Sequence, residues 1–176
     1  MKSDRAMLDS ATAAPLHSAD RQALESALDR AWADPARLHH EGRVARLHLD
    51  AARESVAASL GVTPAEVFFT SSGTEALTEA VSGILRDRRS EGRDLIVGAT
   101  EHSAVLRVAD AYADRGGSVA LAGVDRHGRV DVDALAAQFM ADRPPAAVCL
   151  QAGNQEVGTL QPVAAVAELL DGRPIP

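Results

Sequence analysis

Apolar and polar residues follow one another along the chain in a pattern that predicts strands and helices in alternation. Short runs of apolar and β-branched residues are typical of buried strands, whereas apolar residues three or four positions apart are typical of helices. The predicted strands are 67–70, 94–98, 118–121 and 147–150. The predicted helices are 19–32, 44–60 and one after each strand, ending with 163–170. This alternation is typical of an α/β fold with a mainly parallel sheet and covering helices.

The segment 67–75 joins a predicted strand directly to the start of a predicted helix. Unpaired backbone N–H groups and the positive end of the helix dipole attract an anion to such a junction. Ser71, Ser72 and Thr74 add hydroxyl groups, and Gly73 lets a phosphate approach the backbone closely. A plain capping role for Ser72 or Thr74 stays open as the alternative. The glycine spacing matches neither the dinucleotide nor the Walker-type motif, which disfavours nucleotide binding.

Polar stretches follow the carboxyl ends of the predicted strands 67–70, 94–98 and 147–150. They lie at 71–74, 100–102 and 154–156. Ligands of parallel sheets bind at the carboxyl ends of the strands. The sequence therefore predicts one ligand site built from these stretches.

The composition fits a folded globular protein. Of the 176 residues, 46% are hydrophobic, which suffices for a core. We expect residues 1–15 to form an irregular arm and residues 16–176 to belong to one domain. The formal net charge is −7, with neither a basic stripe nor clustered aromatic residues, which argues against nucleic acid as a partner.

The sequence does not predict an association with a membrane. No apolar run approaches the roughly 18 residues that a membrane helix needs. Residues Met1–Arg5 contain no apolar signal core. We therefore expect a cytoplasmic protein with no membrane partner.

Cysteine, histidine and lysine usage narrows the chemistry further. Cys149 is the only cysteine and lies in an apolar run, so we interpret it as a small core residue. The histidines do not follow the HExxH spacing, and we predict no metal site. Lys2 is the only lysine, so this chain cannot supply a lysine amine from within a structured pocket.

Several segments together resemble the cysteine desulfurases, which belong to the class V aminotransferase group of enzymes dependent on pyridoxal 5′-phosphate (PLP) and have fold type I. The resemblance extends over nearly the whole chain. The matching segments are Leu8–Thr12, Asp34–Gly42, Phe69–Glu75, Glu101–Leu106 and Asn154–Pro162. The resemblance implies the large PLP-binding domain of a transferase of sulfur metabolism.

The resemblance also implies roles for individual residues. Gly73 and Thr74 would hold the PLP phosphate, in agreement with the anion site inferred from the helix start. His102 would stack on the pyridine ring and assist proton transfer, as the catalytic residue of this chain. Gln155 stands where the family usually has its second Asn, and would bond the phenolic oxygen or the substrate. Asn154 is the reserve candidate for that bond.

Further groups that the family requires are expected outside residues 1–176. They are the Asp that pairs with the pyridine nitrogen, the Schiff-base lysine, the cysteine that accepts sulfur and an Arg for the substrate carboxylate. We therefore expect an N-terminal half that needs a complementary C-terminal chain to convert L-cysteine to L-alanine plus enzyme-bound sulfur. A split enzyme, a truncated one and a non-catalytic remnant that binds phosphate or a partner protein stay open. So do other class V enzymes, such as aminotransferases and selenocysteine lyases.

The missing half has a consequence for association. Without it, the sheet lacks neighbouring strands and leaves apolar helix faces, such as that of 163–170, uncovered. We therefore expect a homo-oligomer or heteromer, or self-association of the isolated chain.

Overall fold

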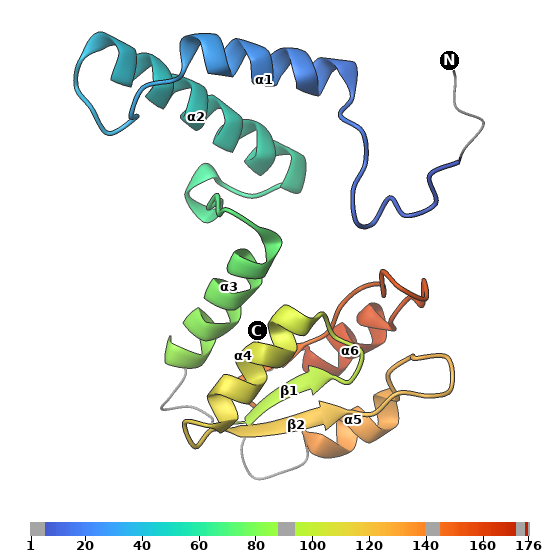
Figure 1. The fold of residues 1–176 in the computed structure, drawn as a ribbon. Coiled ribbons are helices and arrows are strands. Elements are labelled where there is room, and N and C mark those ends of the chain that lie inside the picture. Colours follow the sequence, from blue (N-terminus) through green and yellow to red (C-terminus); the bar gives the residue numbers. More distant parts are fainter. Residues whose placement is uncertain (1–5, 88–93, 140–144, 172–174, 176) are drawn as a thin grey trace. The chain divides into compact units, whose positions relative to one another are not determined.

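The structure is a computed structural model that describes residues 6–87, 94–139, 145–171 and 175 (Figure 1). The chain divides into two compact units, Met1–Phe69 and Thr70–Pro176. Lys2 lies outside the described residues. The expectation of an arm over 1–15 followed by one domain stays a prediction.

The first unit is helical. Its elements are α1 (Ser18–Arg30), α2 (His40–Leu60) and the short 3-10 helix η1 (Pro64–Glu66). The helix predicted at 19–32 is confirmed as α1. Its N-cap is His17, whose Nδ1 accepts the Ala19 N–H at 3.3 Å. The helix predicted at 44–60 is confirmed as α2, and it ends at Gly61. This glycine has a φ of +69°, the left-handed conformation that closes many helices.

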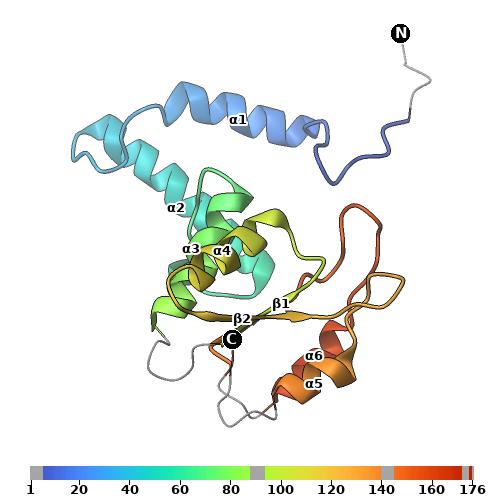
Figure 2. The same cartoon turned by 60° about the horizontal axis from the view of Figure 1, so that its bottom comes forward.

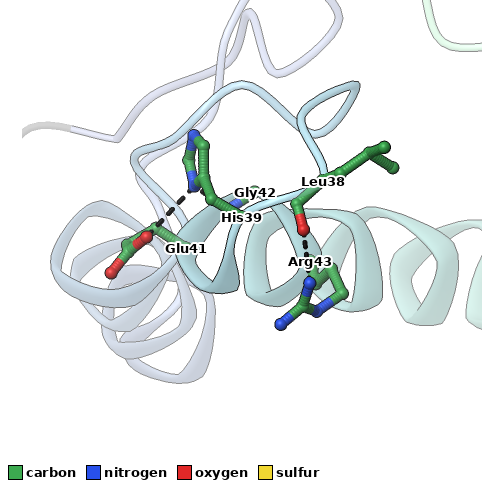
Figure 3. A network of polar contacts seen from close by, with 5 residues as sticks. All are labelled: Leu38, His39, Glu41, Gly42 and Arg43. Carbon is green, nitrogen blue, oxygen red and sulfur yellow. Dashed lines mark hydrogen bonds and ion pairs between the residues drawn. The ribbon is translucent and has the colours of Figure 1, made fainter.

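A set of local hydrogen bonds fixes the start of α2 (Figure 3). His39 Nδ1 lies 3.2 Å from the Gly42 N–H and 3.0 Å from Glu41 Oε2, and Arg43 donates to the Leu38 carbonyl. An Nδ1 without a hydrogen accepts the N–H, whereas an Nδ1 that carries a hydrogen donates to the carboxylate, so the tautomer of the ring decides which contact forms. Glycine is required at position 42 because a Cβ there would lie 2.5 Å from the Arg37 carbonyl oxygen.

The second unit is an α/β layer structure, as predicted. Its elements are α3 (Gly73–Asp87), β1 (Asp94–Gly98), α4 (Ser103–Ala113), β2 (Ser118–Ala122), α5 (Val132–Gln138), β3 (Ala147–Cys149) and α6 (Val163–Leu170). β1 is the central strand of the described sheet, and it pairs in parallel with β2 and with β3. The mainly parallel sheet with covering helices is therefore confirmed.

Side chains of β1 supply the core on both faces of this sheet. Leu95 and Val97 are fully buried in a cluster with residues of α3 and α4. Ile96 points the other way and is buried in a cluster with residues of α5 and α6. Figure 2 shows the sheet edge-on, with α4 on one side and α5 and α6 on the other. This packing holds the described sheet between the two sets of helices.

The prediction of a buried strand at 67–70 is wrong. This segment has no regular secondary structure and pairs with no strand of the described residues, and Phe68 is 83% exposed. Phe69 contacts Arg53, whose guanidinium carbon lies 5.6 Å from the ring centroid. The apolar sequence is that of a strand, but burial requires a neighbouring strand that the described residues do not provide.

No helix within the described ranges is both long and apolar enough to cross a bilayer.

Candidate functional site

The start of α3 is held by its own side chains. Ser72 Oγ accepts the Glu75 N–H at 3.2 Å, so Ser72 is the N-cap of the helix. Glu75 Oε2 accepts hydrogen bonds from the Ser71 hydroxyl and from the Ser71 N–H, at 2.6 and 2.7 Å. These two bonds, the hydroxyl first, lower the pKa of Glu75. The capping role predicted as the alternative for Ser72 is thus confirmed, and the Ser71 hydroxyl is already engaged.

Two predicted phosphate-binding residues remain available at the same helix end. The N–H groups of Gly73 and Thr74 have no acceptor among the described residues, and both residues are exposed. A Cβ built on Gly73 would meet nothing within 4 Å, so a ligand has room to approach this backbone. Capping therefore leaves donors at the positive end of the α3 dipole. The Glu75 carboxylate nearby opposes a second negative charge there.

His102 has a structural role of its own at the start of α4. Its Nδ1 accepts the Ala104 N–H at 3.1 Å, and its backbone N–H donates to Glu101 Oε2 at 3.3 Å. A neutral imidazole that accepts through Nδ1 carries its proton on Nε2. The exposed ring therefore presents the Nε2 N–H as a donor to a ligand.

Asn154 and Gln155 lie in the turn that follows β3. Asn154 Oδ1 accepts the N–H groups of Glu156 and Val157, both at 2.9 Å, and its Nδ2 donates to the Thr100 carbonyl at 3.3 Å. All side-chain hydrogen-bonding atoms of Asn154 are thus used to shape the turn. Gln155 is exposed, and its amide forms no hydrogen bond with the described residues.

Hydrogen bonds tie the loop after β1 to the loop after β3. Gln151 N donates to Glu101 Oε1, and the Gln151 amide donates to the Thr100 carbonyl and, at 3.3 Å, to the Thr100 hydroxyl. Glu101 lies within the predicted polar stretch 100–102, but no role was predicted for it. Gln151 lies outside the predicted stretches, although a polar residue directly after a predicted strand could have indicated it. These bonds bring His102 and Gln155 to the same end of the sheet.

The start of α3 carries the other group of predicted site residues. α3 and α4 pack against each other in one core cluster, to which α3 contributes Val81 and Leu85 from its second half. Among the described residues, no hydrogen bond or ion pair joins Gly73 or Thr74 to His102 or Gln155. The predicted site residues thus form two groups, and the hydrogen bonds described above join only the loops at 100–102 and 151–156.

Cys149 does not take part in this arrangement as a nucleophile. Burial on β3, and then the Glu101 carboxylate, raise the pKa of the Cys149 thiol to about 11. The thiol therefore stays protonated near neutral pH, as is typical of an inert structural cysteine. No group of His, Cys, Asp and Glu side chains that could hold a metal ion occurs in the part of the chain that the structure describes.

Known proteins resemble this chain in sequence and in fold. An "IscS-like cysteine desulfurase" of Mycobacterium tuberculosis is 35% identical over 163 residues, which cover 90% of this chain and 41% of the relative. A solved structure of a "NifS-like protein" is 30% identical with a TM-score of 0.85, over 92% of this chain and 44% of that one. A second structure, "SspA in complex with cysteine", is 25% identical with a TM-score of 0.84, over 96% and 48%.

The chain therefore spans less than half the length of these relatives. The family model for "Aminotransferase class-V" matches residues 6–173. Because this match covers nearly every residue of the sequence, the chain belongs to the class V aminotransferase family.

Proposed function

We propose that this chain is the N-terminal half of the PLP-binding large domain of a cysteine desulfurase. The whole enzyme would convert L-cysteine to L-alanine and keep the sulfur bound to the protein. The observation that supports this most is the open pair of N–H donors at the start of α3, in a chain whose relatives are named cysteine desulfurases. The similar protein SspA forms a complex with cysteine, which favours cysteine as the substrate here.

The residues present fit PLP. Its phosphate suits the N–H groups of Gly73 and Thr74, which are exposed, free of protein acceptors and next to open space. Its ring suits the exposed imidazole of His102, and its phenolic oxygen suits the exposed amide of Gln155. When bound, PLP supplies an electron-withdrawing ring that weakens the bonds to the α-carbon of an amino acid.

Each residue of this chain has a defined task in the proposal. Gly73 and Thr74 donate hydrogen bonds to the phosphate and are assisted by the α3 dipole. His102 covers the ring and donates from Nε2, because Nδ1 is engaged with the Ala104 N–H. Gln155 donates through its amide, while Asn154 shapes the turn that presents it.

The sequence does not supply a covalent anchor for PLP within the described fold, since its only lysine is Lys2. We assign the anchoring lysine, the acidic partner of the pyridine nitrogen and the sulfur-accepting cysteine to a complementary C-terminal half. In this proposal the active enzyme contains both halves, with L-cysteine as its small-molecule substrate.

Co-expression with a candidate C-terminal half tests the proposed activity. Purified mixtures should release alanine from L-cysteine, whereas neither half should do so alone, and His102→Ala should reduce the rate of the mixture. A mixture that binds PLP but transfers an amino group instead would identify another class V enzyme. An assembled, PLP-loaded mixture that does not act on cysteine would contradict the proposal.

PLP binding by the isolated chain is a separate test of the phosphate site. At a free concentration 100 times the Kd, binding stabilises the folded state by about 2.7 kcal/mol. For a chain of this length, that raises the Tm by roughly 5–11 °C. Pyridoxal, which lacks the phosphate, is the matched control and should raise it far less. Equal effects of both compounds would contradict the phosphate site.

A further inference from the structure

Glu101 lies between the two loops that carry the proposed ring contacts. It directly precedes His102 and is only partly exposed. Its Oε1 accepts the Gln151 N–H, and its Oε2 accepts the His102 N–H at 3.3 Å. The side-chain stem packs over the end of β1, since a Cβ built on Gly98 would lie 3.6 Å from Glu101 Cγ. One carboxylate therefore contacts the backbone of both loops.

We propose that Glu101 is a positioning residue, which fixes the spacing between His102 and Gln155 so that both contact one PLP ring. This inference rests on the proposed function. His102 follows Glu101 directly, and Gln155 lies in the turn that begins after Gln151. A shift of either loop would change the distance between the imidazole and the amide, without moving the start of α3.

The chemistry of the contact requires a carboxylate of this length. Both oxygens accept an N–H, and a carboxylate forms stronger hydrogen bonds with N–H donors than a neutral amide does. In Glu101→Gln, the NH2 group must face one of the two N–H groups, so one bond is lost. Glu101→Asp keeps the charge but is one methylene shorter, so it cannot reach both loops from the same backbone position. Negative charge also suits this place, because α4 begins two residues later.

The second link between the loops makes the expected effect specific. The Thr100 carbonyl accepts the amide groups of both Gln151 and Asn154, and these bonds do not involve Glu101. Loss of the Glu101 contact therefore loosens the loops without separating them. The affinity for a ligand that spans both loops should fall, whereas the affinity for a ligand at the α3 start alone should not.

The first measurement requires no PLP. Amide hydrogen exchange of Gln151 should become about tenfold faster or more in Glu101→Gln, because the N–H loses its charged acceptor. The matched control is Glu66→Gln in the first unit, where a carboxylate also accepts a backbone N–H, that of Thr63, at 2.8 Å. In this control the exchange of Gln151 should be unchanged. Unchanged exchange in Glu101→Gln would overturn the assignment.

The second measurement compares two ligands on the same variants. Glu101→Gln and Glu101→Asp should weaken PLP binding about tenfold and leave binding of inorganic phosphate within twofold of the wild type. Equal weakening of both ligands would indicate a general loss of structure and overturn the positioning role. Full PLP affinity in Glu101→Asp would also overturn it, because charge alone would then suffice.

Failure of the proposed function has a different signature. If the wild-type chain binds neither PLP nor phosphate, the proposed function is contradicted. The exchange of Gln151 then decides the contact itself, since faster exchange in Glu101→Gln supports the link between the loops and unchanged exchange overturns it.

Discussion

Replacement of Asn154 by Ala tests whether this residue shapes the turn that presents Gln155. The substitution removes two hydrogen bonds of 2.9 Å from the Glu156 and Val157 N–H groups and a longer one of 3.3 Å to the Thr100 carbonyl. Each well-formed bond contributes about 1 kcal/mol, and the longer one contributes less. Water can reach the exposed N–H groups that are left, so we expect a total loss of about 2 kcal/mol.

This loss has a measurable thermal signature. For a chain of this length, about 2 kcal/mol lowers the Tm by roughly 4–8 °C. Circular dichroism should detect the shift, and amide exchange should accelerate at Glu156 and Val157 in particular. Asn154→Asp keeps both acceptor contacts and loses only the donor, so it should retain most of the stability.

The neighbouring Gln155 is the matched control. Its amide forms no hydrogen bond with the described residues, so Gln155→Ala should leave the Tm within about 1 °C of the wild type. Equal melting of the Asn154→Ala and Gln155→Ala variants would refute the structural role of Asn154. Relative to the stability that each variant loses, PLP affinity should fall more in Gln155→Ala than in Asn154→Ala, because Gln155→Ala removes a proposed direct contact with PLP.

Three further predictions concern other parts of the chain. Gly42→Ala should destabilise the protein by about 1–3 kcal/mol in a urea titration, because the new Cβ would lie 2.5 Å from the Arg37 carbonyl oxygen. A loss of stability below about 0.5 kcal/mol, which is typical of substitutions at the surface, would contradict this. Cys149 should react with iodoacetamide at pH 8 about 100-fold more slowly than a free thiol, since its pKa is raised from 9.0 to about 11, and equal rates would contradict its burial. Hydrogen bonds from Ser71 lower the pKa of Glu75, so the stabilising contribution of this carboxylate is present above about pH 4.5 and is lost as the pH falls through the lowered pKa. The Tm difference between wild type and Glu75→Gln should therefore shrink as the pH falls through this range. A difference that stays constant with pH would contradict the contact.

The sequence pattern predicted the second unit well because its strands and helices form an apolar core within the same unit. Leu95, Ile96 and Val97 form a continuous apolar run, as expected of a strand covered on both faces. The segment 67–70 has the same apolar character but has no strand partner among the described residues. Periodicity reports which side chains prefer burial, and it contains no information on whether a partner strand is present.

The candidate site shows a similar division. The positions of the polar stretches follow from the rule that loops at strand ends bind ligands, and the structure brings 100–102 and 154–156 together. Which atoms remain available could not be predicted from residue types alone. Ser71 and Asn154 are engaged in local turns, whereas Gln155 is not. The capping preference of Ser and Asn indicates this role, but only the backbone geometry decides it.

An NMR titration of the isolated chain with PLP tests the central claim most directly, and Lys2→Arg removes the only lysine amine with which the aldehyde could react. We predict the largest amide shifts at Gly73 and Thr74, followed by His102 and Gln155, and we predict shifts at the first pair alone with inorganic phosphate. Saturable binding with its largest shifts elsewhere, or no shift at Gly73 and Thr74, would contradict a phosphate site at the start of α3.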